Sequence, residues 1–506
     1  MNVFDYLMDN RAADADAVLF TPAGEHSYGE LRQAAEAMSR FLILSGMQKG
    51  DRVLLLADNS FFWVACYLGT LRAGGVSVPL APNVSDEDLK FIIGSCDVRF
   101  ALVHGRATGS QLLLFPTGCK VVLESTAKLP EGFVGDSVSF SDVLASSSDV
   151  GSWPKIDELK DLAAIMFTSG STSKPRGVMI SHHNIICNTS AIVQYLELAA
   201  QDRMMVVLPF FYCFGTSLLH THLRVGGSLV LDPRFMFPDK VLVRMQETRC
   251  TSFAGVPSHY QILLRKSSFT KMQFPDLRRL QQAGGKLADA LIRELRETVP
   301  MTKLFVMYGQ TEATARLSYL PPDLLDNKLG SIGRGLPGTR LKVVDEDGNP
   351  VLPGQVGEIV AQGGNVALGY WEADDEDQGA FRNGSLYTGD LATVDEDGFI
   401  FIVDRSKDIL KCGGKRSPCR EVEDALLEFD DLVEAAVIGV PDDLLGEAVK
   451  AFVVPRQNGG QVIERLNAFC LQRLPAHLVP KEIVVLDELP KGSGGKILKP
   501  ALRMVS

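Results

Sequence analysis

The stretch Ile165-Met-Phe-Thr-Ser-Gly-Ser-Thr-Ser-Lys-Pro-Arg-Gly177 joins an apolar run to a loop of hydroxyl groups and glycine. The apolar run predicts a buried strand, and exposed backbone N–H groups directly after such a strand are suited to hold an anion. Lys174 and Arg176 add positive charge. A flexible surface turn is the alternative, but such turns seldom follow a buried strand with so many hydroxyls and two cations. The loop residues expected to bind phosphate are Thr168, Ser169, Gly170, Ser171, Thr172 and Lys174.

Segments with strand character and helix character alternate on both sides of this loop. Apolar strands are expected at 51–56, 76–80, 204–208 and 303–307, and helices at 61–74 and 237–248. Alternation of this kind predicts an α/β fold, with helices layered around largely parallel sheets.

Two changes along the sequence divide the chain. From about residue 330 the strands shorten and turn signals become frequent, which predicts a small β-rich subdomain over about 330–404. Polar residues interrupt two apolar strands at 404–408, and helices and strands mix again beyond them. We expect a large N-terminal domain over 1–404, built from layered α/β subdomains and the β-rich subdomain. A small, mobile α+β lid domain is expected over 405–506.

Composition narrows the class of protein. The 506 residues carry a formal net charge of −11, which argues against a broad nucleic-acid-binding surface. The nine cysteines are scattered and form no CxxC pair, which argues against a disulfide framework or structural zinc and fits a reducing compartment. Residues 1–10 lack the pattern of a secretory signal, and no apolar run reaches the roughly 18 residues that span a bilayer. We therefore expect a cytoplasmic protein.

The hydroxyl loop resembles the phosphate loop of the adenylate-forming superfamily, which includes acyl-CoA synthetases, beetle luciferases and nonribosomal-peptide adenylation domains. Further motifs of the family follow in the family's order, and the pattern is most similar to AMP-forming acyl-CoA synthetases. These motifs are Tyr308-Gly-Gln-Thr-Glu312, Tyr387-Thr-Gly-Asp390, Phe401-Ile-Val-Asp-Arg405 and Pro490-Lys-Gly-Ser-Gly-Gly-Lys496. Each alone has an ordinary reading, such as a capped turn, a hairpin, a solvated arginine or a flexible tail. Their shared order makes chance similarity implausible.

The resemblance implies a role for each motif. Tyr308 would stack on adenine, and Glu312 would hold Mg²⁺, because a carboxylate beside a triphosphate is sensible only with a cation between them. Asp390 would bind the ribose hydroxyls, and Arg405 the ribose and phosphates. The implied ATP and AMP contacts outside the hydroxyl loop are Gly284, Tyr308, Gly309, Gln310, Thr311, Asp390 and Arg405. The implied catalytic residues are Thr168, Glu312 and Lys496, the last neutralising charge as the carboxylate joins the α-phosphate.

The lid motifs imply a second step. Lys407 lies at the family's hinge position, and Gly413 and Gly414 belong to the loop that forms its thiol tunnel. Ser417-Pro418 stands one position earlier after the glycines than is usual in the family. The basic residues near this loop, Lys411, Lys415, Arg416 and Arg420, suit a nucleotide 3′-phosphate, a carrier-protein helix or plain solvation.

The activity that the resemblance implies is an ATP-dependent carboxylic acid:CoA ligase. It would form acyl-AMP and pyrophosphate, then transfer the acyl group to the CoA thiol, with ATP, Mg²⁺ and CoA as cofactors. The alternative is a ligase that loads the phosphopantetheine arm of an acyl carrier protein. Luciferase-like oxygenation and an inactive nucleotide- or acyl-binding protein are weaker options. No nucleic-acid partner is expected, and a homodimer is one option for the assembly.

The acid pocket is expected near the segment 208–217. This segment contains no acidic residue, whereas amino-acid-activating relatives place Asp there, so an α-amino acid is disfavoured. Many relatives have His where Tyr212 stands. The candidate pocket residues are Tyr212, Phe214, Val256, Ser258, His259, Ala283, Gly284 and Gly285. They are mostly apolar or small, which favours an aliphatic or aryl acid, although core packing explains any one of them as well. His220 and His222 are expected to be core residues and not metal ligands.

Overall fold

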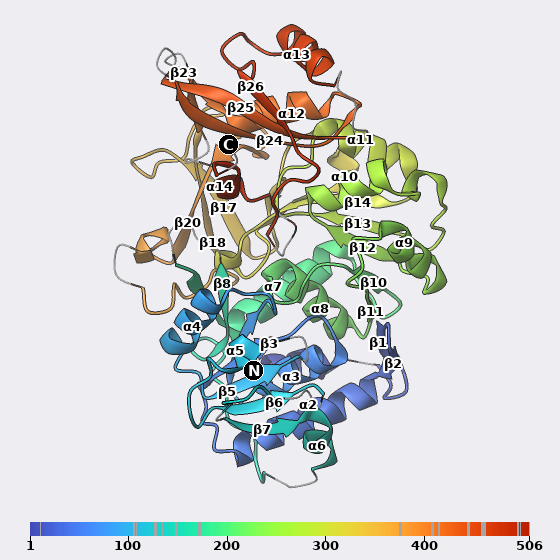
Figure 1. Cartoon of the computed structure of the whole chain (residues 1–506), viewed down its shortest axis with the longest axis vertical. Coiled ribbons are helices and arrows are strands. Elements are labelled where there is room, and N and C mark those ends of the chain that lie inside the picture. The colour runs from blue at the N-terminus through green and yellow to red at the C-terminus, as the bar shows by residue number, and fades with distance from the viewer. Residues whose placement is uncertain are drawn as a thin grey trace.

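The described strands form four β-sheets along the molecule (Figure 1). The computed structural model describes the chain except for residues 11, 105–106, 108, 126–128, 134, 147–149, 169–173, 374–376, 406–408, 413–414, 443–445, 457–461, 493–494, 496 and 505–506, and the side chains of 377–378, 404–405, 409, 411 and 415–416. Among the described helices, none combines the length and the apolar character that a membrane crossing requires.

The first sheet contains the strand that leads into the hydroxyl loop. Its bounds are β3 Arg52–Leu56, β4 Val76–Leu80, β5 Phe100–Val103, β6 Lys120–Leu123, β7 Asp136–Ser139, β8 Leu162–Thr168 and β9 Arg176–Ser181. The strand order is β7-β6-β5-β3-β4-β8-β9, and every pairing is parallel except that of β8 with β9. The hydroxyl loop therefore leaves the carboxyl end of a parallel strand, where α/β sheets bind their ligands.

The second sheet supplies the strand ends that carry the other nucleotide motif. Its bounds are β1 Ala17–Thr21, β2 Gly24–Ser27, β10 Arg203–Val206, β11 Ser228–Leu231, β12 Ser252–Gly255, β13 Arg279–Gln282, β14 Lys303–Tyr308, β15 Ser318–Leu320 and β16 Arg334–Gly335. The order is β16-β15-β14-β13-β12-β10-β11-β1-β2. The six strands from β14 to β1 pair in parallel, and the edge strands are antiparallel.

The largest apolar core joins these two sheets. It contains Val53 and Leu55 of β3 together with Met204 of β10 and Leu229 of β11. The helices of this region are α1 Val3–Met8, α2 Tyr28–Leu44, α3 Phe61–Arg72, α4 Asp86–Ser95, α5 Gly109–Leu112, α6 Phe140–Ala145, α7 His182–Leu196, α8 Cys213–Val225, α9 Pro238–Glu247, α10 Pro257–Lys266 and α11 Asp289–Thr298. Helix α3 is buried on all sides, from Phe62 to Leu71, and its sequence is accordingly apolar around the whole helix.

Two smaller sheets complete the chain. The third, antiparallel sheet consists of β17 Thr339–Val344, β18 Gly357–Gly363, β19 Phe381–Arg382, β20 Ser385–Val394 and β21 Ile400–Arg405. The fourth consists of β22 Ile409–Cys412, β23 Lys415–Pro418, β24 Leu432–Asp442, β25 Gly446–Pro455 and β26 Glu482–Val485. It carries α12 Cys419–Leu427, α13 Val462–Arg473 and α14 Lys499–Leu502, and lies at the top of Figure 1.

The expected fold class is confirmed: two large α/β layers, a small β-rich part and a separate α+β part. The strands expected at 51–56, 76–80, 204–208 and 303–307 are observed with ends displaced by no more than two residues. The strands change from the third sheet to the fourth between Arg405 and Ile409. The domain boundary at 404/405 stays a prediction that this change supports.

Candidate active site

The hydroxyl loop lies in the hairpin between β8 and β9. Thr168 ends β8, and its hydroxyl donates to the Arg176 carbonyl at 3.4 Å. The Lys174 ammonium lies 5.3 Å from the centroid of the Phe91 ring on α4. Four of the predicted phosphate ligands lie outside the described residues: Ser169, Gly170, Ser171 and Thr172.

A distant segment, 368–371, extends the sheet beside this hairpin. The amide of Trp371 donates to the Gly177 carbonyl at 2.7 Å, and the amide of Met179 donates to the Gly369 carbonyl at 2.9 Å. This pairing places the Tyr370 ring under the Arg176 guanidinium, with 4.6 Å between the guanidinium carbon and the ring centroid. The Tyr370 hydroxyl donates to Glu312 Oε1 at 2.9 Å. The flank of the hydroxyl loop and the predicted magnesium ligand are therefore linked through one tyrosine.

The predicted adenine and ribose residues also meet. The Tyr308 hydroxyl donates to Asp390 Oδ2 at 2.7 Å, and both side chains are buried. Asp390 pairs with Arg405 across β20 and β21, so the backbone of the next predicted ribose ligand lies opposite it. The Arg405 side chain lies outside the described part of the structure. The end of β14 and the middle of β20, from two different sheets, thus bring these two predicted site residues together.

The turn after β14 is fixed by a close approach of backbone. A Cβ atom on Gly309 would lie 2.0 Å from the Ala315 carbonyl oxygen, so only glycine fits there. The Gln310 side-chain amide nitrogen is buried without a hydrogen-bond partner among the described residues. The Thr311 hydroxyl lies 3.4 Å from Cys213 Sγ at the start of α8. The segment predicted to bind ATP therefore borders the segment predicted to bind the acid.

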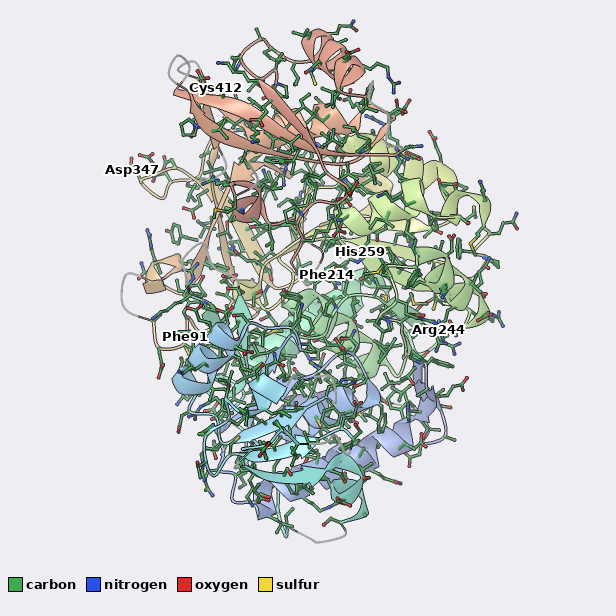
Figure 2. All side chains as sticks on the ribbon, in the orientation of Figure 1. Phe91, Phe214, Arg244, His259, Asp347 and Cys412 are labelled. Atoms are coloured by element: carbon green, nitrogen blue, oxygen red, sulfur yellow. The ribbon has the colours of Figure 1, made fainter. Side chains whose placement is uncertain are left out.

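The candidate acid-pocket residues come from three segments that lie close together. Val256, Ser258 and His259 begin α10, and Ala283, Gly284 and Gly285 follow β13. A Cβ atom on Gly285 would lie 3.2 Å from Pro257 Cγ, and Gly284 adopts a φ of +86°. Phe214 packs against the apolar cluster that contains Ala283, whereas the Tyr212 ring packs on Phe211 with 5.0 Å between centroids. Figure 2 shows Phe214 and His259 in the central part of the molecule.

His259 is held in its neutral form. The Val256 amide donates to its Nδ1 at 3.2 Å, and the Phe235 ring stands edge-on to the imidazole, 4.5 Å between centroids. Burial is the main cause that lowers the pKa of His259 to about 4, and the charge of Lys491 acts in the same direction. A neutral, buried ring at this position suits an apolar pocket wall.

The loop that precedes Lys496 lies against the same wall. The Ser258 hydroxyl donates to the Gly495 carbonyl at 2.9 Å. A Cβ atom on Gly495 would lie 3.1 Å from both His259 Cε1 and Val256 Cγ2, and its φ of +77° also favours glycine. A 2.6 Å ion pair between Lys286 Nζ and Asp424 Oδ2 joins the two parts of the chain nearby. Lys496 itself, with Lys407, Gly413 and Gly414, lies outside the described residues.

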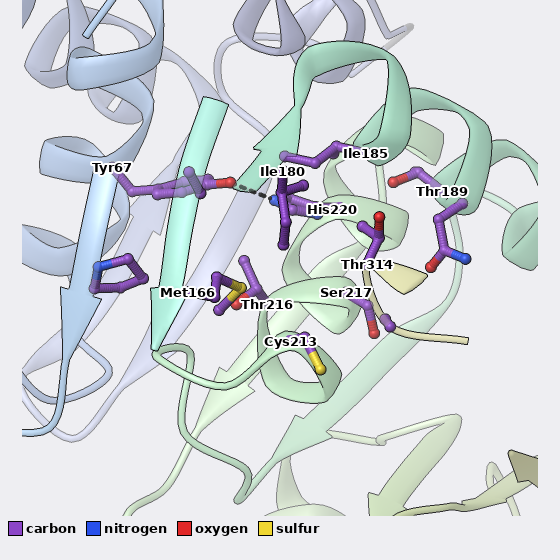
Figure 3. Close-up of a pocket in the computed structure, with 14 residues that line it drawn as sticks. Tyr67, Met166, Ile180, Ile185, Thr189, Cys213, Thr216, Ser217, His220 and Thr314 are labelled. Carbon is purple, nitrogen blue, oxygen red and sulfur yellow. Dashed lines mark hydrogen bonds between the residues drawn. The ribbon is translucent and has the colours of Figure 1, made fainter. Parts of the chain in front are cut away.

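A small cavity lies between α7 and α8, next to the acid-pocket segment (Figure 3). Its volume of about 10 Å³ leaves room for about one water molecule. Tyr67 and His220 hydrogen-bond at its wall, 2.9 Å between the hydroxyl oxygen and Nε2, as Figure 3 shows. His222 Nδ1 donates to the Leu218 carbonyl at 2.9 Å. Both histidines are buried and hydrogen-bonded, which is the core role expected for them.

Family comparison agrees with this geometry. The profile described as "AMP-binding enzyme" matches residues 8–371, and the profile "AMP-binding enzyme C-terminal domain" matches residues 421–496. The chain belongs to the AMP-binding enzyme family. The expected superfamily and the expected enzyme class, an AMP-forming acid–thiol ligase of the acyl-CoA synthetase type, are confirmed.

Relatives of this AMP-binding enzyme match it over nearly its whole length. A long-chain-fatty-acid–CoA ligase of Bacillus subtilis (strain 168) is 32% identical and aligns with 98% of this chain and 93% of its own. The crystal structure of an anthranilate CoA ligase in complex with anthranoyl-AMP superposes with a TM-score of 0.88 at 26% identity, covering 100% and 97% of the two chains. ATP-bound MatB from Rhodopseudomonas palustris gives 0.86 at 29% identity, covering 100% and 98%.

Two residues that contact predicted site residues were not anticipated from the sequence of this AMP-binding enzyme. Tyr370 carries no motif of its own and reaches Glu312 only because 368–371 pairs with β9. Arg316 is 1% exposed and lies 5.0 Å over the Phe214 ring. The one signal for Arg316 is a cation four residues after Glu312 in an otherwise apolar stretch.

Proposed function

We propose that the chain is an ATP-dependent carboxylic acid:CoA ligase that forms acyl-AMP and then transfers the acyl group to the CoA thiol. The observation that carries the proposal is the convergence of its motifs. The Tyr308 hydroxyl bonds to Asp390, and Tyr370 joins Glu312 to the flank of the hydroxyl loop. The Gly495 carbonyl accepts a hydrogen bond from Ser258, one of the residues predicted to line the acid pocket. Residues for ATP, for the acid and for the reacting phosphate are thereby adjacent.

The chemical problem for such an enzyme is the approach of two negative groups. A carboxylate oxygen attacks the α-phosphate, a new C–O–P bond forms, and the bond to pyrophosphate breaks. The hydroxyl loop and Lys174 would hold the phosphates, and Lys496 would neutralise charge on the carboxylate and α-phosphate. Preorganised cations and N–H groups stabilise the transition state without a side-chain nucleophile.

Glu312 fits the predicted role of magnesium ligand. One carboxylate oxygen accepts from Tyr370, which fixes the carboxylate while leaving acceptor capacity on the other oxygen. Magnesium sites commonly combine one or two carboxylates with substrate phosphates, which matches a single glutamate beside a phosphate loop. The bound ion would supply charge neutralisation to the triphosphate.

The thiol step is assigned to the lid. β22 and β23 form an antiparallel hairpin whose connection is Gly413-Gly414, the predicted thiol-tunnel segment. We propose that the lid turns about Lys407 after adenylation, which withdraws Lys496 and admits the thiol. CoA is the favoured acceptor because the relative from Bacillus subtilis is a CoA ligase. A carrier-protein phosphopantetheine is the alternative outcome of the test below.

The acid is proposed to be aliphatic or aryl in its main body. The predicted pocket residues Phe214, Val256 and Ala283 belong to apolar clusters. The segment 208–217 has no carboxylate for an α-ammonium group. The relatives named above act on a long-chain fatty acid and on anthranilate, so both classes belong in the test.

The direct test is ATP–pyrophosphate exchange with fatty, branched, aryl and amino acids, followed by addition of CoA to the best responder. Exchange with an organic acid and subsequent acyl-CoA formation is the expected result. Exchange without acyl-CoA formation would indicate that a carrier protein, and not CoA, accepts the acyl group. Absence of exchange with every acid would overturn the proposal.

A further inference from the structure

Arg316 is a buried cation without a counter-ion in the part of the chain that the structure describes. Its side chain is among the largest that are fully buried, with 1% of the residue exposed. Nη2 donates to Gln281 Oε1 at 3.2 Å, whereas Nε and Nη1 have no hydrogen-bond partner among the described residues. An arginine keeps its charge in proteins, and an uncompensated buried charge is strongly unfavourable.

A second buried arginine shows what a structural role looks like here. Arg279, 8% exposed, donates from Nη1 to Asp202 Oδ1 at 2.7 Å and from Nε and Nη2 to the carbonyls of Leu196 and Glu197. Its charge is paired, and Nε, Nη1 and Nη2 each have an acceptor. Arg316 has no paired carboxylate among the described residues and an acceptor for only one of its three nitrogens, so packing alone does not account for it.

The position of Arg316 is firmly fixed. Its backbone carbonyl accepts hydrogen bonds from the side-chain amides of Asn188 at 2.8 Å and Asn365 at 2.9 Å. Its Cα lies where a Cβ on Gly309 would approach within 2.6 Å, so the chain passes tightly over the end of β14. Three separate parts of the sequence thus hold one residue in place, which is the support expected of a binding group.

The unsatisfied polar atoms of Arg316 and of its hydrogen-bond partner Gln281 are all hydrogen-bond donors. They are Nε and Nη1 of Arg316 and Nε2 of Gln281, which is itself fully buried. The missing partner is therefore an acceptor with several lone pairs, and a carboxylate matches the planar arginine fork. The guanidinium stacks on Phe214, a residue of the predicted acid pocket, and lies near Tyr195; both rings pack in the apolar cluster that contains Ala283.

We propose that Arg316, assisted by Gln281, binds a second carboxylate group at the far end of the acid, so that the substrate is a dicarboxylic acid with an apolar body. The inference rests on the proposed function, because it takes the adenylated acid to lie beside Phe214. One carboxylate of the substrate reacts with ATP, and the carboxylate at its other end binds to the buried arginine. Arg316 is thus a specificity-determining residue and takes no part in bond making.

The test is ATP–pyrophosphate exchange with matched pairs of acids: pentanoate and pentanedioate, hexanoate and hexanedioate, octanoate and octanedioate, benzoate and benzene-1,3-dicarboxylate. The best dicarboxylate is expected to exceed its monocarboxylate partner by about 100-fold in kcat/KM. Arg316→Met is expected to remove this preference, and Arg316→Lys to retain part of it, because lysine keeps the charge but not the fork.

Two further readouts separate binding from structure. Arg316→Met is expected to keep ATP binding and to unfold at the same or a higher temperature, because it removes an unpaired buried charge. Arg279→Met is the matched control: it breaks an ion pair, so it lowers the unfolding temperature and leaves the acid preference unchanged. Preference of the wild type for monocarboxylates, or an equal loss on all acids in Arg316→Met, overturns the inference while adenylation itself stands. If none of the acids supports exchange, the proposed function is overturned as well.

Discussion

The nucleotide side of the site, defined by Tyr308, Glu312, Tyr370 and Asp390, differs in construction from the acid side, defined by Phe214, Gln281 and Arg316. On the nucleotide side the polar groups hold one another, through the Tyr308–Asp390 and Tyr370–Glu312 hydrogen bonds. On the acid side, Nε and Nη1 of Arg316 and Nε2 of Gln281 find no partner among the described residues. The first arrangement is complete without a ligand, whereas the second, under the proposal made above, is completed by the far carboxylate of the acid.

Removal of Lys496 should produce the largest effect. If it neutralises charge where the carboxylate meets the α-phosphate, Lys496→Ala should lower the adenylation rate by about 10³-fold while ATP binding stays measurable. Exchange kinetics and calorimetric ATP titration provide the two readouts. Lys481→Ala, which removes an exposed ion pair with Asp442 on the fourth sheet, is the control that should leave exchange unchanged. Full retention of exchange in Lys496→Ala would refute the assignment.

Asp390→Asn should weaken the nucleotide side next. The substitution keeps the shape but removes the charge that strengthens hydrogen bonds to the ribose and to Tyr308, so KM for ATP should rise by about 30-fold. The KM for the acid should change little if the two sides are independent. An equal rise in the KM for ATP and the KM for the acid would show that the nucleotide side and the acid side are not independent.

The sequence predicted the motif residues that the structure brings together on the nucleotide side, but it did not point to Tyr370 or Arg316. The motifs around Thr168, Tyr308 and Asp390 are local, because each combines glycine, hydroxyl and charged residues within a few positions. Tyr370 depends on a pairing between 368–371 and β9, almost two hundred residues apart, which no local pattern reveals. The burial of Arg316 depends on packing by α7, α8 and β13, so the sequence alone presents it as an ordinary arginine.

Tyr370→Phe should give a smaller effect on the nucleotide side. It removes one hydrogen bond to Glu312 but keeps the ring under Arg176, so kcat/KM for ATP should fall by about 5-fold. The fall should be steeper at low Mg²⁺, because a less firmly held carboxylate binds the ion less well. Steady-state exchange at several Mg²⁺ concentrations measures this dependence. A decrease in kcat/KM that is the same at every Mg²⁺ concentration would mean that Tyr370 does not act through Glu312.

The smallest expected effect concerns pH on the acid side. The pKa of His259 in the folded protein, about 4, lies below its ordinary value of 6.5 because burial favours the neutral ring. Its contribution to stability is therefore complete above pH 6.5 and is lost as the pH falls toward 4. Urea unfolding at pH 7, 5.5 and 4.5 should show a smaller loss in His259→Gln, which keeps an acceptor for the Val256 amide. The same loss in both proteins would mean that His259 is not held neutral.

Mass spectrometry of the products shows whether this site joins an acid to AMP and then to a thiol. The protein is incubated with ATP, Mg²⁺ and the acid that gives the fastest exchange, first without and then with CoA. Acyl-AMP is expected in the first mixture, and acyl-CoA with equimolar AMP in the second. Formation of ADP and phosphate in place of AMP, or acyl-CoA without any nucleotide turnover, would contradict the proposed function.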